Sequence, residues 1–231
     1  MSNKITNNYI SKTWFYIIDE ISPSVIDIWE SIYVTILILN TKKPCTINVS
    51  SKSTLDLFWL FYDKSPSKIL INQVDDSSVV SFKSVFLNKN EDLQTNIKSY
   101  ISWNNSKSNL KIIWLVSDKK LSIDSNIEVE SWVKNWNARL EIENIFLSDK
   151  WSVKSLPNLF VRSDDIKASH ACKTEKISEA KKFYLKSRWL SDSDASFMLI
   201  EGYFVNTFNC LKMIDRGVYE NIYERFLEFS R

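Results

Sequence analysis

Short runs of β-branched and aromatic residues, separated by Ser, Asn, Asp and Lys, fill the chain from about residue 31 to about residue 170. They recur about every ten to fifteen residues, with no strong helical periodicity between them. Runs of this kind are typical of strands, and their regular recurrence indicates an all-β unit. The runs are Tyr33–Leu39, Cys45–Val49, Leu55–Tyr62, Lys68–Ile71, Val79–Leu87, Leu110–Val116, Ile127–Val133, Arg139–Phe146, Asn158–Val161 and Asp165–His170.

Glycine is almost absent, since only Gly202 and Gly217 occur in 231 residues. Turns that need a positive φ must therefore use Asn, Asp or Ser. Neither Asn-Gly nor Asp-Gly occurs, so the usual sequence signal of a two-residue hairpin is missing. This favours a solenoid or a sandwich over a hairpin meander, and a β-helix with irregular coils would leave no visible repeat.

The two ends of the chain differ from this β-rich middle. Residues 1–30 predict an N-terminal segment in which the amphipathic stretch Val25–Trp29 forms a short helix after Pro23. The β core is expected over 31–173. A helical domain is expected over 174–231, because apolar residues there recur at helical spacing.

Two helix starts and one helix end are indicated within this C-terminal part. Ser178 is a candidate N-cap, and Ser191 with Asp194 three residues later resembles a capping box. Gly217 predicts a stop after Ile214.

Composition narrows the classes of function. The 30 basic and 28 acidic residues give a formal charge of +2, so no overall field favours nucleic acid or an anionic membrane. The longest apolar stretch is far shorter than a bilayer span. Three cysteines without zinc-knuckle spacing favour a reducing compartment, so we expect a cytoplasmic protein or one of the stroma of a plastid-type organelle.

Several motifs in the last third of the chain resemble the SufB/SufD family of iron–sulfur cluster assembly proteins. Ser155–Ala171 is similar to a SufD-type signature in which a Pro-led strand is followed by an Asp-Asp pair and then by Ser-His. Phe183–Arg188 and Ser191–Ala195 resemble the family's Phe-Tyr-Leu, Ser-Arg-Gly turn and acidic helix start. Leu199–Phe204 falls at its leucine-rich helix. The resemblance covers residues 138–214, in one order and at matching spacing.

The resemblance implies a right-handed parallel β-helix followed by a C-terminal helical domain. It also implies a non-catalytic scaffold subunit of a SUF-type complex, in which a SufB/SufD-type subunit, in a hetero- or homodimer, holds a transient iron–sulfur cluster at the subunit interface. A SufC-type ATPase would hydrolyse ATP and dock on the helical domain. The partner-binding residues implied in this way are Phe183, Tyr184, Arg188, Leu199, Tyr203 and Phe204.

Departures from the family pattern favour a SufD-like member over a SufB-like one. Ala171 stands where SufD-type chains have glycine and SufB-type chains have glutamate, and Ile142 lies near the position of a SufB cysteine. Trp189 replaces the glycine of the Ser-Arg-Gly turn. That turn therefore either accommodates a large side chain in a right-handed conformation or has another shape. The chain is also shorter than typical members.

His170 and Cys172 are the candidate metal ligands. His170 is the single histidine, and alternate residues of a strand share a face about 6.5–7 Å apart. Two ligands do not complete a zinc or iron–sulfur site, so a partner would supply the rest. A histidine with only a structural role and a buried, inert Cys172 are the competing interpretations, and Cys45 and Cys210 are expected in the core.

The remaining candidate sites have a structural explanation at this stage. The aromatic residues at helical spacing are first expected in the core, and Asp164-Asp165 is expected to form a turn. A single histidine excludes the metal hydrolase sites that need two, and two glycines exclude a Gly-rich phosphate loop. Two alternatives to the scaffold stay open: a β-solenoid that only mediates protein contacts, and a β-helix carbohydrate-active enzyme that uses two carboxylates.

Overall fold

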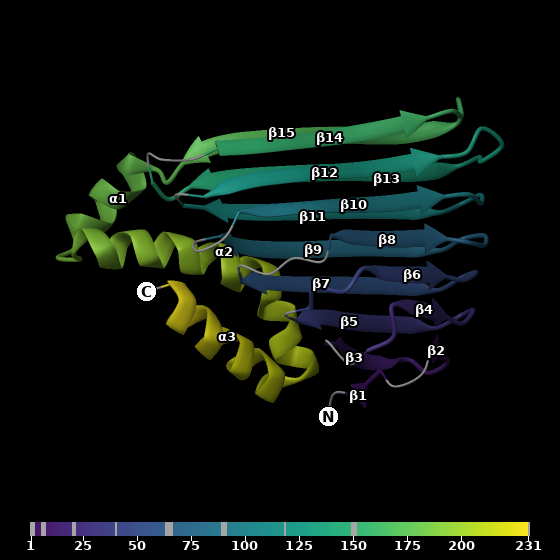
Figure 1. Cartoon of the computed structure of the whole chain (residues 1–231), viewed down its shortest axis with the longest axis horizontal. Coiled ribbons are helices and arrows are strands. Elements are labelled where there is room, and N and C mark those ends of the chain that lie inside the picture. Colours follow the sequence, from purple (N-terminus) through teal and green to yellow (C-terminus); the bar gives the residue numbers. More distant parts are fainter. Residues whose placement is uncertain are drawn as a thin grey trace.

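The chain forms two parallel sheets stacked into a β-helix, with three helices at its C-terminal end (Figure 1). The computed structural model describes residues 3–5, 8–19, 22–39, 41–62, 67–88, 92–117, 119–148 and 152–230. The first sheet contains β1 (Asn3–Lys4), β3 (Trp14–Ile18), β5 (Tyr33–Leu39), β7 (Thr54–Tyr62), β9 (Val79–Asn88), β11 (Lys107–Val116), β13 (Trp136–Phe146) and β15 (Ile166–Lys176).

The second sheet contains the strands that alternate with these along the chain. They are β2 (Tyr9–Ile10), β4 (Val25–Ile28), β6 (Cys45–Val49), β8 (Lys68–Gln73), β10 (Leu93–Ile101), β12 (Lys120–Val129) and β14 (Ser152–Val161). The chain therefore changes sheet after every strand, and each strand pairs in parallel with the strand two elements later. This arrangement confirms the predicted β-helix with a helical C-terminal part.

The space between the two sheets holds the main hydrophobic core, built as columns of side chains that run from coil to coil. One column passes through Phe61, Phe86 and Trp114, and the rings of Phe86 and Trp114 stack at 3.8 Å. The same column continues into Asn144 and Thr174 on the last two coils. The inner columns thus change from aromatic to polar toward the β15 end.

The turns after the even-numbered strands use the left-handed backbone region without glycine, as the composition predicts. Their positive-φ residues include Ser31, Ser77, Asn105 and Asn135, with φ between 50° and 60°. The N–H of Ser77 donates to the carbonyl of Asn104 one coil further on, and that of Asn105 donates to Lys134 in the same way. These stacked turns bind each coil to its neighbour.

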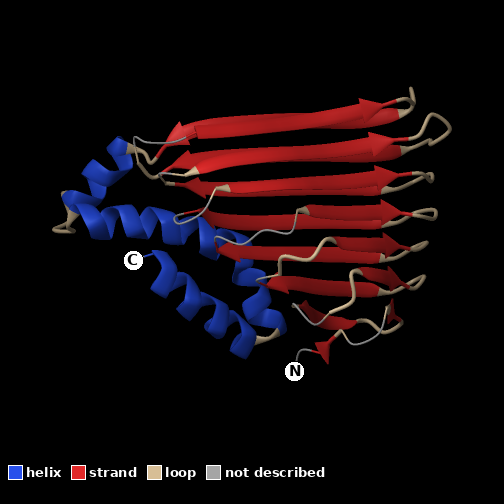
Figure 2. Cartoon of the chain, in the orientation of Figure 1, coloured by secondary structure: helices blue, strands red, loops and turns tan. Residues whose placement is uncertain are grey.

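Three helices follow the last strand: α1 (Glu179–Lys186), α2 (Asp192–Ile214) and α3 (Arg216–Ser230). Figure 2 shows α2 and α3 beside the strands. Side chains of both helices pack on the outer face of the first sheet and form a second core with it. This core is built around Phe204 and Phe208 from α2 and Phe226 from α3. Within the described residues, no helix is long and apolar enough to span a membrane.

Two details of the sequence prediction are wrong. Val25–Ile28 is strand β4, because Ile26 and Ile28 point into the core of the solenoid while Val25 faces outward. The predicted end of α2 after Ile214 is confirmed, but Gly217 does not cause it, because Gly217 lies in the first turn of α3 and Asp215, with an extended backbone, ends α2. The caps at Ser178 and Ser191 are confirmed by hydrogen bonds to the N–H groups of Lys181 and Asp194.

Candidate functional site

Strand β15 forms an open edge of the solenoid and carries both predicted metal ligands. It is the last strand of the first sheet, as β14 is of the second, and the two lie together at the end opposite the N-terminus (Figure 1). Ala168 packs against the inner core, so His170 and Cys172 also project to the inner side of the sheet. Both side chains are exposed.

Each of these residues ends an apolar column of the core. His170 is in register with the fully buried Leu140, and Cys172 is in register with Ile142. Ile142 lies near the position of a SufB cysteine in the family resemblance, so Cys172 places a thiol one coil further out. The prediction that Cys172 is buried is wrong, because its side chain is exposed.

Asn144 lies below this edge and holds the cysteine. Its amide nitrogen lies 3.6 Å from the Cys172 sulfur and 3.2 Å from the Thr174 hydroxyl. Asn144 is only 1% exposed, and its Oδ1 has no hydrogen-bond partner among the described residues. No sequence signal distinguishes Asn144, because the chain contains many asparagines.

A single chain provides too few ligands for a closed metal site. Among the described residues, no three His, Cys, Asp or Glu side chains lie close enough to hold one ion. The other cysteines do not help, since Cys45 is in the core, where burial raises the pKa of its thiol to about 12. Cys210 is exposed on α2, contrary to its prediction as a core residue.

The outer side of β15 faces the helices and is charged. Lys173 Nζ pairs with Glu175 Oε1 at 2.7 Å. Tyr203 of α2 lies near this pair, and its pKa is raised first by burial and then by the charge of Glu175. A pocket of about 450 Å³ separates the strand from α1 and α2 here. Its lining comprises Lys173, Glu175, Ile177, Ser178, Lys181, Met198, Leu199, Gly202, Tyr203 and Asn206.

The corner between α1 and α2 exposes a group of aromatic side chains. Phe183 is 76% exposed, Tyr184 58% and Trp189 98%. The Arg188 guanidinium lies over the Tyr184 ring at 5.3 Å and hydrogen-bonds its hydroxyl at 3.1 Å. The prediction that Phe183 and Tyr184 are core residues is wrong, because α1 has no buried residue. We call Phe183, Tyr184, Arg188 and Trp189 the aromatic corner.

Trp189 has a left-handed backbone, with a φ of 68°. The alternative of a right-handed conformation at this turn is therefore wrong. A non-glycine residue in this region is strained by about 1–2 kcal/mol. The strain is maintained at a side chain that has almost no contact with the rest of the protein.

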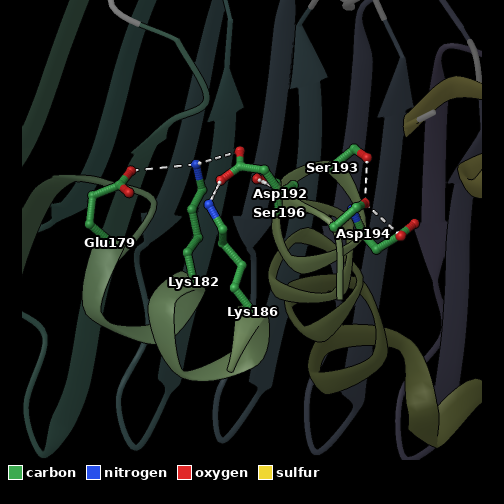
Figure 3. A network of polar contacts seen from close by, with 8 residues as sticks. Glu179, Lys182, Lys186, Asp192, Ser193, Asp194 and Ser196 are labelled. Carbon is green, nitrogen blue, oxygen red and sulfur yellow. Dashed lines mark hydrogen bonds and ion pairs between the residues drawn. The ribbon is translucent and has the colours of Figure 1, made fainter. Parts of the chain in front are cut away.

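Ion pairs fix this corner to the start of α2 (Figure 3). Lys186 Nζ lies 3.0 Å from Asp192, and Lys182 Nζ lies 3.7 Å from the same carboxylate and 3.4 Å from Glu179. The hydrogen bond from Lys186 and the charge of Lys182 lower the pKa of Asp192. Exposed ion pairs contribute little to the free energy of unfolding. The main effect of this network is therefore to orient α1 relative to α2.

The predicted partner-binding residues differ in how far their side chains are exposed. Phe183, Tyr184 and Arg188 are exposed, whereas Leu199 and Tyr203 are half-buried against the first sheet. Phe204 is fully buried and packs on Phe226 with ring centroids 4.5 Å apart. Phe204 therefore cannot contact a partner and is corrected to a core residue.

The architecture defines a class of protein, a parallel β-helix that carries its C-terminal helices on one outer face and leaves one end open. Residues 47–203 match the family model "SUF system FeS cluster assembly, SufBD core domain". The chain belongs to the SufBD family.

Curated proteins with significant similarity carry the same family description. An iron–sulfur cluster assembly SufBD family protein of Synechocystis is 27% identical over 158 residues, which are 65% of this chain and 31% of that protein. The iron–sulfur cluster assembly protein SufD of Escherichia coli is 27% identical over 112 residues, 48% of this chain and 26% of SufD. SufB of Bacillus subtilis is 29% identical over 66 residues, 29% of this chain and 14% of SufB. These matches span less than a third of each relative.

Proposed function

We propose that this chain is a scaffold subunit of a SUF-type complex for iron–sulfur cluster assembly. The observation that carries the proposal is the match to the SufBD core domain over residues 47–203, which includes the open edge and the start of the helical part. Family membership supports a role in cluster assembly rather than carbohydrate chemistry. The roles that we propose for single residues are supported by the geometry of the site and by the resemblance to the SufB/SufD family.

The open end of the solenoid is the surface on which a SufB/SufD-type subunit would pair. Strand β15 is 11 residues long and contains neither proline nor glycine, and its outer edge has no neighbouring strand among the described residues. Unpaired strand edges of this length are usually protected or used for pairing with another chain. A partner strand added here would also cover His170 and Cys172, which are the exposed ends of two inner columns.

His170 would then supply a ligand, or a positioning group, for the nascent cluster at this interface. A neutral imidazole binds iron through one nitrogen, and the partner would provide the ligands that this chain lacks. The cluster is the cargo of the scaffold and leaves it. ATP hydrolysis belongs to the partner ATPase, so the chain itself carries no catalytic step.

The aromatic corner is the surface that we assign to the SufC-type ATPase. Large exposed aromatic side chains and an arginine held by stacking are the residue types that dominate interface energies. The ion pairs at Asp192 hold the corner in one orientation, which reduces the entropy lost on docking. The half-buried Leu199 and Tyr203 lie on the adjacent surface of α2.

The test is gel filtration of the purified chain with a SufC-type ATPase at micromolar concentration. A specific interface of standard size would be largely formed there, so the two should co-elute. Tyr184→Ala should weaken the complex by more than about tenfold. Trp103→Ala is the matched control. Trp103 is also an exposed aromatic residue, 49% exposed, but it lies on a turn of the solenoid and not in the aromatic corner. Failure to co-elute, or equal effects of both variants, would contradict the docking assignment.

A further inference from the structure

A pocket of about 350 Å³ lies at the opposite end of the first sheet from β15. It forms where the outer side of β3 and β5 meets the junction between α2 and α3 (Figure 1). The volume is within the range of about 300–1,000 Å³ that is usual for small-molecule sites. The described residues of the lining are Thr13, Trp14, Phe15, Tyr33, Thr35, Ile214 and Asp215. The proposed scaffold function makes no use of this pocket.

The wall of the pocket is rich in aromatic side chains. Phe15 is buried in the second core, whereas Trp14, Tyr33 and Ile214 are each about half exposed. The backbone N–H of Tyr33 donates to the Thr13 hydroxyl at 3.2 Å, which ties β5 to the residue before β3. Partly exposed aromatic residues gathered around one cavity are typical of a binding site.

The charged group in the described lining is a carboxylate. Asp215 Oδ1 accepts a hydrogen bond from the N–H of Val218 at 3.1 Å and so caps α3. This hydrogen bond lowers the pKa of Asp215, so the carboxyl group stays ionised at neutral pH. Asp56 adds a second negative charge nearby, because it is in register with Thr35 and accepts a hydrogen bond from the Tyr33 hydroxyl.

The basic residues close to Asp215 in the sequence have other contacts. Lys212 Nζ lies over the Tyr219 ring, 5.8 Å from its centroid, and Arg216 Nε pairs with Glu220 at 2.7 Å. None of the described residues that line the pocket is basic. Aromatic faces and carboxylates both attract positive charge, so the pocket is complementary to a cation.

The scarcity of hydrogen-bond acceptors favours one kind of cation. A primary ammonium group carries three N–H donors, and burying it is costly unless each donor finds an acceptor. Besides the carboxylate, the described lining offers the hydroxyls of Thr13 and Thr35, and that of Thr13 already accepts from the backbone. A quaternary ammonium group has no N–H to satisfy, and its charge is attracted to the faces of aromatic rings.

We propose that this pocket binds a soluble small molecule with a quaternary ammonium head group, held between the aromatic side chains of the first sheet and the carboxylate of Asp215. The bound molecule would bridge the first coils of the solenoid and the junction between α2 and α3. The inference is independent of the proposed scaffold function, since it concerns the other end of α2 from the aromatic corner.

Choline is the probe, and its neutral carbon analogue, in which a carbon atom replaces the charged nitrogen, is the matched control ligand. Binding is measured by NMR titration at constant ionic strength. Choline should bind saturably with a dissociation constant of about 1 mM or lower, and the neutral analogue should bind at least about tenfold more weakly. No saturable binding of choline, or equal affinity for the two ligands, would overturn the proposal.

The aromatic wall is tested at Tyr33. Tyr33→Leu should weaken choline binding by at least about tenfold, whereas Tyr33→Phe keeps the ring and should stay within about threefold of the wild type. Tyr9→Leu is the matched control, because Tyr9 is an exposed tyrosine of β2 in the second sheet and does not line the pocket. Circular dichroism checks that each variant is folded. Equal losses in Tyr33→Leu and Tyr9→Leu would overturn the assignment.

The role of charge is tested with Asp215→Asn, which keeps a residue that can cap α3 and removes the negative charge. This variant should bind choline at least about threefold more weakly and should bind the neutral analogue as the wild type does. An unchanged affinity for choline would show that the carboxylate does not face the ligand and would overturn the proposal.

The same head group occurs in phosphatidylcholine, so vesicles of that lipid form the last arm of the experiment. Wild type that binds free choline and does not sediment with the vesicles would support a soluble ligand. Sedimentation of wild type but not of Tyr33→Leu would assign the pocket to a lipid head group and overturn the assignment to a soluble molecule.

Discussion

Replacing Trp189 with glycine should stabilise the protein, although it removes the largest type of side chain. The residue has a φ of 68° and is 98% exposed, so the change relieves backbone strain and loses almost no buried surface. The relief is about 1–2 kcal/mol, and the greater freedom of glycine in the unfolded chain offsets about 0.5–1 kcal/mol of it. The net stabilisation should be about 0.5–1 kcal/mol, measured by urea denaturation.

The same change should impair docking if the aromatic corner binds the ATPase. Loss of a central tryptophan from an interface costs about 2 kcal/mol, or about 30-fold in the dissociation constant. Titration calorimetry of Trp189→Gly against the ATPase measures this loss, and Trp189→Asn keeps a residue that tolerates positive φ as a backbone control. A variant that is both less stable and equal in affinity to the wild type would refute the reasoning on strain and on docking together.

Three further predictions follow from the capping, packing and ionisation of particular side chains. Ser191→Ala should cost about 1 kcal/mol of unfolding free energy because the α2 cap is lost, whereas Ser196→Ala within the helix should change it by less than about 0.5 kcal/mol, both by urea denaturation. Phe204→Ala should cost about 3–5 kcal/mol and increase hydrogen exchange in α2 and α3, since it empties the core that joins the helices to the first sheet. The hydrogen bond to Glu130 raises the pKa of Tyr100 from 10.0 to about 12, so the stability that wild type has over Tyr100→Phe should be fully present below pH 10 and lost as the pH rises through about 12.

The β-helix could be predicted because most inward-facing residues of its strands are apolar, and the sequence shows them as β-branched and aromatic runs. Strand β10, Leu93–Ile101, contains no such run. Its outward positions hold polar residues such as Asn96, and this face of the second sheet carries Asn–Asp hydrogen bonds from coil to coil. A strand with one polar and one apolar face gives a weaker signal than a buried one.

The N-terminal error has the same origin in a short pattern. Val25, Ile28 and Trp29 fit helical spacing, but a stretch of five residues does not distinguish a helix from a strand. The decision comes from long-range pairing, since β4 gains hydrogen bonds from β2 and β6. Such pairing cannot be read from local sequence.

The candidate site was predicted only in part. The alternation of β15 correctly placed His170 and Cys172 on one face, but their exposure depends on β15 being the last strand of its sheet. Likewise, the sequence predicted α1 as amphipathic, but whether Phe183 and Tyr184 lie in a core depends on how α1 sits beside the solenoid. The exposure of all four side chains depends on the tertiary structure, which the local sequence does not specify.

Anaerobic reconstitution of the complex formed with a SufC-type ATPase and a SufB/SufD-type subunit tests the scaffold role most directly. Iron and acid-labile sulfide per complex are measured for wild type and for His170→Ala, after gel filtration has shown that both assemble equally. The account predicts that the variant complex is intact but accumulates less iron and sulfide, because the exposed imidazole of β15 is lost without a change in the buried core. Equal accumulation in the two complexes would contradict a role of this open edge in cluster assembly.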